Sequence, residues 1–226
     1  MTSSLKRLDD GLWIADQLLK YLGVEMGSRM TIVEIADSDE LAVISPIRPT
    51  EFLVEQIRQI GTVTSIIAPN LLHHLFVQDF KNEFPDARLY GPEGLKKKRV
   101  DLNLDDTFEE SKTYPWSTTL THHLVQGFPK GDECVFFVPH LKTLIVTDLG
   151  FHICQNKPFL TRVFFKALGH FGKFGWSSLE KKLYIKNKEA FAKSILKISD
   201  WDFEKIIMAH GRPILENGSR VFKDAF

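Results

Sequence analysis

Three apolar runs of this chain are each followed by side chains that bind metal ions in other proteins. Residues 66–68 precede His73 and His74, residues 143–147 precede Asp148, and residues 206–209 precede His210. Buried strands read as apolar runs, and sites in layered α/β folds lie where such strands end. Imidazole nitrogen and carboxylate oxygen are ordinary ligands of zinc and iron. The pattern therefore predicts that these four side chains converge on one divalent metal ion.

Each of these residues also has an ordinary structural interpretation. A His next to a Gly at the end of a strand is often a loop residue, and Asp148 could cap a following helix. The pair His73 and His74 could mark the polar start of a helix. The occurrence of all three features after apolar runs favours the metal site over these alternatives.

Composition and charge restrict the class of protein. The chain has 226 residues, of which 43% are hydrophobic and 26% charged, which suits one domain spanning residues 1–226 with its own core. The 29 Lys and Arg balance the 29 Asp and Glu, so no global electrostatic field favours binding to nucleic acid or to an anionic membrane.

The two cysteines of the chain do not form a disulfide framework. Residues 1–7 lack the apolar core of a signal peptide, and no apolar run approaches the ~20 residues that span a bilayer. We expect a cytoplasmic protein with a small-molecule substrate, and the oligomeric state is not readable.

Strand and helix patterns alternate along the chain. The sequence predicts strands at residues 11–15, 30–35, 41–44, 63–68, 87–90, 118–125, 134–138, 141–147 and 205–209. It predicts a helix from Pro49 to Gly61, with Phe52, Ile57 and Ile60 in the core, a second helix over residues 72–84, and a mainly helical region over 151–199. Residues 30–35 and 41–44 should form a hairpin through the turn at Asp37. This order favours an α/β (α+β) fold in which two sheets pack face to face with helices outside.

The whole chain resembles the metallo-β-lactamase superfamily, a four-layer αββα sandwich. The matching pieces, in the order of the family, are residues 70–74, 84–87, 89–92, 133–137, 143–149 and 210–211. They resemble a branch with an Asn-x-x-His-His motif, here Asn70 to His74, in place of His-x-His-x-Asp-His. The resemblance implies a hydrolase that uses bound metal.

The departures from the family motif remove one of its two metal sites. The first-site ligands would fall at Pro69, Leu71 and about Phe128, none of which can bind a metal. The second-site ligands would fall at His73 (in place of Asp), His74, Asp148 and His210, and all of these can bind. The resemblance therefore implies a single ion, zinc in first place and iron as the alternative.

Function follows from that reduced site, with alternatives that the sequence leaves open. One interpretation is a hydrolase that activates water for attack on an ester, thioester, amide or phosphodiester, with Asp148 as a ligand that also takes part in catalysis. Asn70, through an Asx-type turn, and His152, through a hydrogen bond, would hold the metal ligands in position. In one alternative His73 packs locally and only His74, Asp148 and His210 bind the ion, and in another no metal binds. The competing function is a non-catalytic relative that binds a small ligand or a protein partner.

Overall fold

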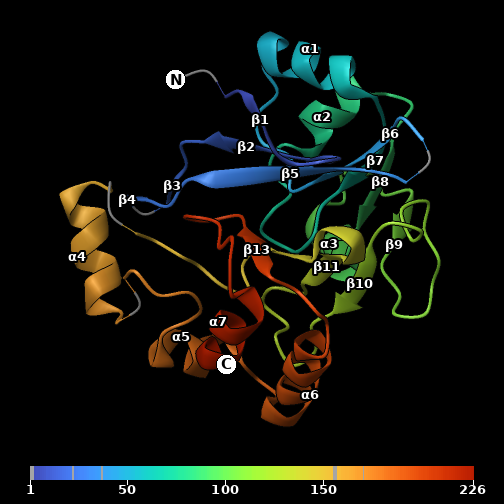
Figure 1. Ribbon diagram of the computed structural model, residues 1–226. Helices are drawn as coiled ribbons and strands as arrows, with labels where there is room; N and C mark the ends of the chain where they lie inside the picture. The colour runs from blue at the N-terminus through green and yellow to red at the C-terminus, as the bar shows by residue number, and fades with distance from the viewer. Residues whose placement is uncertain (1–2, 22, 37, 155–156, 170) are drawn as a thin grey trace.

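Two sheets pack face to face, and helices cover both outer faces (Figure 1). The computed structural model describes residues 3–21, 23–36, 38–154, 157–169 and 171–226. The predicted αββα arrangement is confirmed by this layering. The expected turn residue Asp37 lies outside the described residues, but the two strands that it joins do form an antiparallel pair.

The larger sheet has seven strands among the described residues, in the order β1-β2-β5-β6-β7-β8-β9. Their bounds are β1 Leu5–Asp9, β2 Leu12–Gln17, β5 Ser28–Glu34, β6 Glu40–Ile44, β7 Thr62–Ile67, β8 Arg88–Gly91 and β9 Asp106–Thr107. The strands from β1 to β6 pair antiparallel, whereas β6 to β9 run parallel. The carboxyl ends of β6 and β7 therefore lie at the same edge of this sheet.

The second sheet has four strands in the described part of the chain, in the order β10-β11-β12-β13. They are β10 Thr121–Leu124, β11 Cys134–Val138, β12 Thr143–Val146 and β13 Lys205–Met208, and the short helix η1 (Pro139–Leu141) joins β11 to β12. Strands β12 and β13 are parallel, so their carboxyl ends also share an edge. A small hairpin of β3 (Lys20–Tyr21) and β4 (Val24–Glu25) stands beside the sheets.

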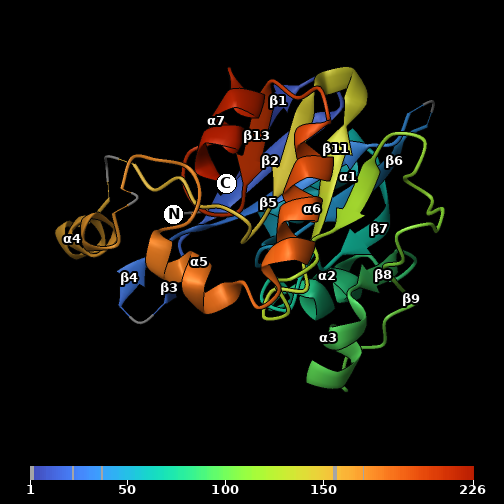
Figure 2. The ribbon, with the colours of Figure 1, turned by 90° about the horizontal axis from the view of Figure 1, so that it is seen from below.

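Helices shield the outer face of each sheet (Figures 1 and 2). The larger sheet is covered by α1 Glu51–Ile60, α2 Val77–Glu83 and α3 Glu93–Lys98. The second sheet is covered by α5 Ser178–Tyr184, α6 Lys188–Ser199 and α7 Gly218–Ala225, with α4 Phe159–Ala167 further out. Among the described residues, none of these helices combines the length and apolar character needed to cross a bilayer.

Side-chain alternation along the strands produces the layers. In β11, Phe136 points into the core between the sheets, while its neighbours Val135 and Phe137 point to the helices on the outer face. In β5, Val33 points between the sheets and Ile32 points to the helices of the larger sheet. Successive residues of a strand face opposite sides. Strands that are apolar at every position must therefore be covered on both faces, which requires four layers.

The structure corrects some predicted boundaries and contacts. The helix expected over residues 72–84 begins only at Val77, and residues 73–76 before it form a turn. Phe52, expected in the core, is 53% exposed, whereas Ile57 on the same helix is fully buried. Strand β1 and helix α7 were not predicted.

Candidate metal centre

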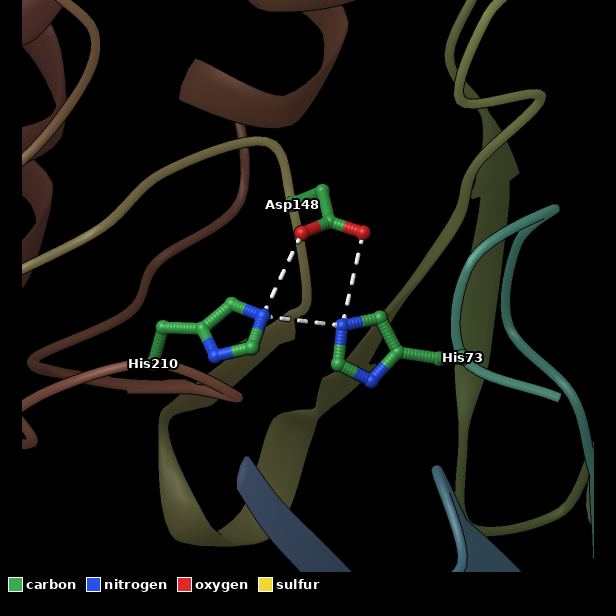
Figure 3. Close-up of side chains that lie close together, drawn as sticks. All are labelled: His73, Asp148 and His210. Atoms are coloured by element: carbon green, nitrogen blue, oxygen red, sulfur yellow. Dashed lines mark hydrogen bonds and ion pairs between the residues drawn. The ribbon is translucent and has the colours of Figure 1, made fainter. Parts of the chain in front are cut away.

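His73, Asp148 and His210 come together where strands of both sheets end (Figure 3). His73 follows β7, Asp148 follows β12 and His210 follows β13. The Nε2 atoms of the two histidines are 3.2 Å apart. Asp148 Oδ2 lies 3.3 Å from His73 Nε2, and Asp148 Oδ1 lies 3.4 Å from His210 Nε2. All three side chains are less than 10% exposed.

The second ring nitrogen of each histidine is held by a partner behind the centre. His210 Nδ1 lies 2.6 Å from the backbone oxygen of Gly27, and a carbonyl oxygen only accepts, so Nδ1 carries the proton. In the neutral ring, the lone pair of His210 is then on Nε2, which faces Asp148. His73 Nδ1 lies 2.7 Å from Ser45 Oγ. Ser45 directly follows β6 and has a φ of +56°, a conformation that non-glycine residues rarely adopt.

Asn70 connects the turn that carries His73 to Asp148. It is completely buried, and its side-chain oxygen accepts from the backbone N–H of Leu72 (2.8 Å) and of His73 (2.7 Å). This is the Asx-type turn expected from the sequence. Its amide nitrogen donates to Asp148 Oδ2 (2.7 Å) and Thr147 Oγ1 (2.9 Å). The turn fixes the backbone of Leu72 and His73 ahead of α2, which begins at Val77.

A second buried carboxylate, Glu133, holds the backbone of Asp148. Its oxygens accept from the N–H of Thr147 (2.7 Å) and of Asp148 (2.9 Å). Burial and the charge of Asp148 raise the pKa of Glu133 above its usual range. Burial would also raise the pKa of Asp148, but the charges and hydrogen bonds of His73 and His210 outweigh it and hold that pKa well below its usual range. The centre thus favours an ionised Asp148.

His74 lies outside the gathered donors. The group of metal-capable side chains within 4.8 Å of one another in the described part of the chain is His73, Asp148 and His210, without His74. Arg99 Nη1 donates to His74 Nδ1 at 2.9 Å. Burial, followed by the charges of Lys98 and Arg99, lowers the pKa of His74 to about 4. The structure thus gathers His73 and leaves His74 aside, the reverse of the three-ligand alternative that the sequence left open.

His152 contributes to the centre through its backbone. Its N–H donates to the oxygen of His210 (3.2 Å) and its oxygen accepts from the N–H of Arg212 (2.9 Å). The side chain points elsewhere, because Nδ1 donates to the oxygen of Arg212 at 2.8 Å. Gly211 has a φ of +97°, and a Cβ there would lie 2.1 Å from the oxygen of His152. Only glycine allows the close approach that positions His210.

Arg29 fixes the same loop from the larger sheet. Its side chain is 7% exposed, and Nη1 donates to the backbone oxygens of Met208 and Gly211, both at 2.8 Å. Nη2 forms an ion pair with Asp16 at 2.9 Å. A buried guanidinium therefore fastens the end of β13, which carries His210, to strand β5.

Apolar side chains occupy the positions at which the resemblance implies first-site ligands. Phe128 is 3% exposed, and its ring centroid lies 4.8 Å from that of Trp176. Trp176 Nε1 donates to the backbone oxygen of Asp148 at 2.7 Å. Leu71 donates its N–H to the oxygen of Gly131, and Pro69 accepts from the N–H of Cys134, so this segment joins the two sheets. An aromatic cluster thus supports Asp148 where a second ion would require donors.

The donor set fits one divalent ion. Ligand distances of about 2.0–2.1 Å from zinc to nitrogen place two donors of a tetrahedron about 3.3–3.4 Å apart, close to the 3.2 Å between the Nε2 atoms of His73 and His210. Each of these two nitrogens lies within 3.4 Å of a different oxygen of Asp148. Two neutral imidazoles and one carboxylate form a common zinc ligand set. The carbonyl that fixes the His210 tautomer and the amide that holds Asp148 match the usual outer partners of metal ligands.

Comparison with known protein families identifies the family of this chain. A family model described as "Domain of unknown function (DUF4336)" matches residues 9–172, which is most of the chain. The chain belongs to this family. No curated protein matches the sequence of this DUF4336 member.

Solved structures similar to this DUF4336 protein are metallo-β-lactamases. The enzyme from Pontibacter korlensis has a TM-score of 0.65 and 13% identity, covering 99% of this chain and 100% of that one. The enzyme from Hirschia baltica has a TM-score of 0.62 and 12% identity, covering 98% of both chains. FIM-1 from Pseudomonas aeruginosa in its mono-zinc form has a TM-score of 0.63 and 10% identity, covering 99% and 92%. The likeness confirms the metallo-β-lactamase fold.

Several residues of the centre were not singled out from the sequence. Ser45 follows strand β6 as directly as Asp148 follows β12, so the strand-end rule could have indicated it. Glu133 and Arg29 are charged residues at the start of apolar runs, and that signal is weak. The carbonyl of Gly27 has no side-chain signal, and only the tertiary structure places it behind His210.

Proposed function

We propose that this protein is a metal-dependent hydrolase with a single divalent ion, zinc in first place and iron as the alternative, held by His73, Asp148 and His210. The observation that carries the proposal is the convergence of these three donors, with the tautomer of His210 assigned by the carbonyl of Gly27. Three protein ligands leave a coordination position open, as in catalytic zinc sites, whereas four ligands are typical of structural sites. The placement of His74 beside Arg99 thus supports a catalytic centre.

Residues around the centre would orient its metal ligands and set its net charge. A bound ion would supply Lewis acidity that acidifies a water and polarises the scissile bond of an ester, thioester, amide or phosphodiester. Asp148, kept ionised by its neighbours and fastened by Asn70, would hold the negative charge facing the ion. Gly27 and Ser45 keep both imidazoles directed at the same point. With one carboxylate among the ligands, the centre would carry a net positive charge that favours an anionic transition state.

Metal content of purified variants tests the ligand assignment. We expect about one equivalent of zinc in the wild type, and loss of tight binding in His73→Ala, Asp148→Ala and His210→Ala. His74→Ala should retain its metal, as should His140→Ala, a matched control at an exposed histidine. Titration against a chelating dye gives the affinities. Absence of metal uptake by the wild type would refute the proposal, and retention of metal by His73→Ala with loss in His74→Ala would refute this ligand set.

A non-catalytic relative that binds a small ligand or a protein partner is the second candidate. It is favoured by the apolar packing of buried Phe128 and partly buried Leu71 where the resemblance implies ligands of two-metal family members, and by the low exposure of the three donors. A screen of the zinc-loaded protein against esters, thioesters, amides and phosphodiesters separates the candidates. Turnover that disappears in Asp148→Ala supports the hydrolase, and absence of turnover across the screen supports the second candidate.

A further inference from the structure

Helix α4 exposes an apolar surface at the periphery of the molecule. Phe159 is 74% exposed, Leu160 71%, Val163 47% and Phe164 45%. Only Thr161 and Phe165 of this helix are buried, and Thr161 Oγ1 accepts from the backbone N–H of Glu25 in β4. Figures 1 and 2 both show α4 at the edge of the structure, beside the β3–β4 hairpin. The exposed side chains are therefore not covered by the rest of the described chain.

The exposed apolar side chains form one continuous face. Residues of a helix are separated by about 100° around its axis. On this projection the four exposed residues, together with exposed Ala167, cover a single arc of about 140°. Arg162 and Lys166 lie between this arc and the buried face. Helix α4 thus has a buried side, a cationic border and a free apolar side, which is the organisation of helices that lie at a membrane interface.

The charged side chains of residues 157–179, which include α4, are all cationic. Between residues 157 and 179 the sequence contains Lys157, Arg162, Lys166 and Lys173 and no Asp or Glu, although the net charge of the chain is zero. Glu25, the acidic residue against which α4 packs, is already paired with Lys157 at 3.4 Å. The local surface therefore combines exposed aromatic and aliphatic groups with three cations, Arg162, Lys166 and Lys173, that have no acidic partner among the described residues.

We propose that α4 docks the protein on an anionic lipid bilayer, with Phe159, Leu160, Val163 and Phe164 in the headgroup boundary. The cationic border complements acidic lipid headgroups, whereas a second copy docked face to face would bring two sets of cations together. Exposed apolar groups in a continuous patch indicate a binding surface. This inference is independent of the metal centre.

Sedimentation with vesicles of phosphatidylcholine, with and without phosphatidylserine, tests the proposal. We expect the wild type to bind only the vesicles that contain phosphatidylserine. The double variant Leu160→Ser/Phe164→Ser should lose at least tenfold in affinity, since it removes two apolar side chains from the interface. Arg162→Gln/Lys166→Gln should lose about 25-fold, since each cation near an anionic surface contributes about fivefold. Leu196→Ser on α6, an equally exposed leucine at 66%, is the matched control and should bind like the wild type.

The outcomes that overturn the proposal are distinct. Failure of the wild type to bind either vesicle, equal binding to both vesicles, or equal loss in Leu196→Ser excludes an anionic-membrane surface on α4. A concentration-dependent dimer that is abolished by Leu160→Ser/Phe164→Ser, without vesicle binding, assigns the face to a second copy instead. All substituted side chains are exposed, and a thermal unfolding measurement on each variant checks that it is folded.

Discussion

Replacement of Asn70 by Ala should weaken both the fold and the metal centre. The substitution removes a charge-assisted hydrogen bond to Asp148, worth about 2 kcal/mol, and leaves the N–H groups of Leu72 and His73 without their acceptor, at about 1 kcal/mol each. The site is completely buried, so water does not readily replace these partners. Together with the neutral hydrogen bond to Thr147, worth about 1 kcal/mol, these losses should lower the free energy of unfolding by about 5 kcal/mol, a large part of the about 5–15 kcal/mol of a typical domain.

The metal affinity of Asn70→Ala should fall about 10- to 100-fold, the usual effect of removing an outer partner of a ligand. Here the cause is that the same amide positions Asp148 and the turn carrying His73. Urea unfolding with a chelator present measures stability without the contribution of bound metal. Competition with a chelating dye then measures zinc affinity on folded protein.

Two control variants separate this role from a general loss of stability. Thr147→Val removes the bond from Asn70 to Thr147 and the interaction of the Thr147 hydroxyl with Glu133, leaves Asn70 bound to Asp148 and to the turn, and should cost about 2 kcal/mol. Asn103→Ala, at an exposed asparagine, should be neutral. A loss below about 1 kcal/mol in Asn70→Ala, or an unchanged zinc affinity, would show that the observed network does not hold the centre.

Two further predictions concern a glycine and a surface carboxylate. Gly211→Ala should destabilise the protein by about 3 kcal/mol or more in chemical unfolding, because it combines a positive φ with a clash against His152. The control Gly169→Ala, at a φ of +83° in open space, should cost only about 1 kcal/mol. Similar losses of stability in the two variants would exclude the clash. Burial would raise the pKa of Glu110, but the N–H of Leu124, Lys197 and His123 outweigh it and lower that pKa to about 2. Because the folded-state pKa is depressed, the stabilisation is complete above about pH 4.5 and is lost as the pH falls toward 2. Glu110→Gln should lower the free energy of unfolding by about 1 kcal/mol at pH 7, after discounting for solvent screening, and by progressively less below pH 4.5. A difference in stability that does not depend on pH would contradict this origin.

The sequence by itself determined the layered architecture. Apolar runs such as residues 134–138 and 143–146 have no polar face, so their strands must be covered on both sides. The donor types and their positions after strands could also be read directly, because parallel strands present their carboxyl ends at one edge. The cation-only segment around α4 is equally present in the sequence, but the global charge balance conceals it.

The tertiary structure decided which of two adjacent histidines joins the centre. Neighbouring residues in a turn point in different directions, so local sequence could not choose between His73 and His74. The choice depends on Ser45, which contacts His73, and on Arg99, which contacts His74; both come from distant segments that meet these histidines only in the folded chain. Their hydrogen bonds act over about 3 Å, a distance that strand patterns do not specify. The sequence therefore supplied the donors, and packing selected and oriented three of them.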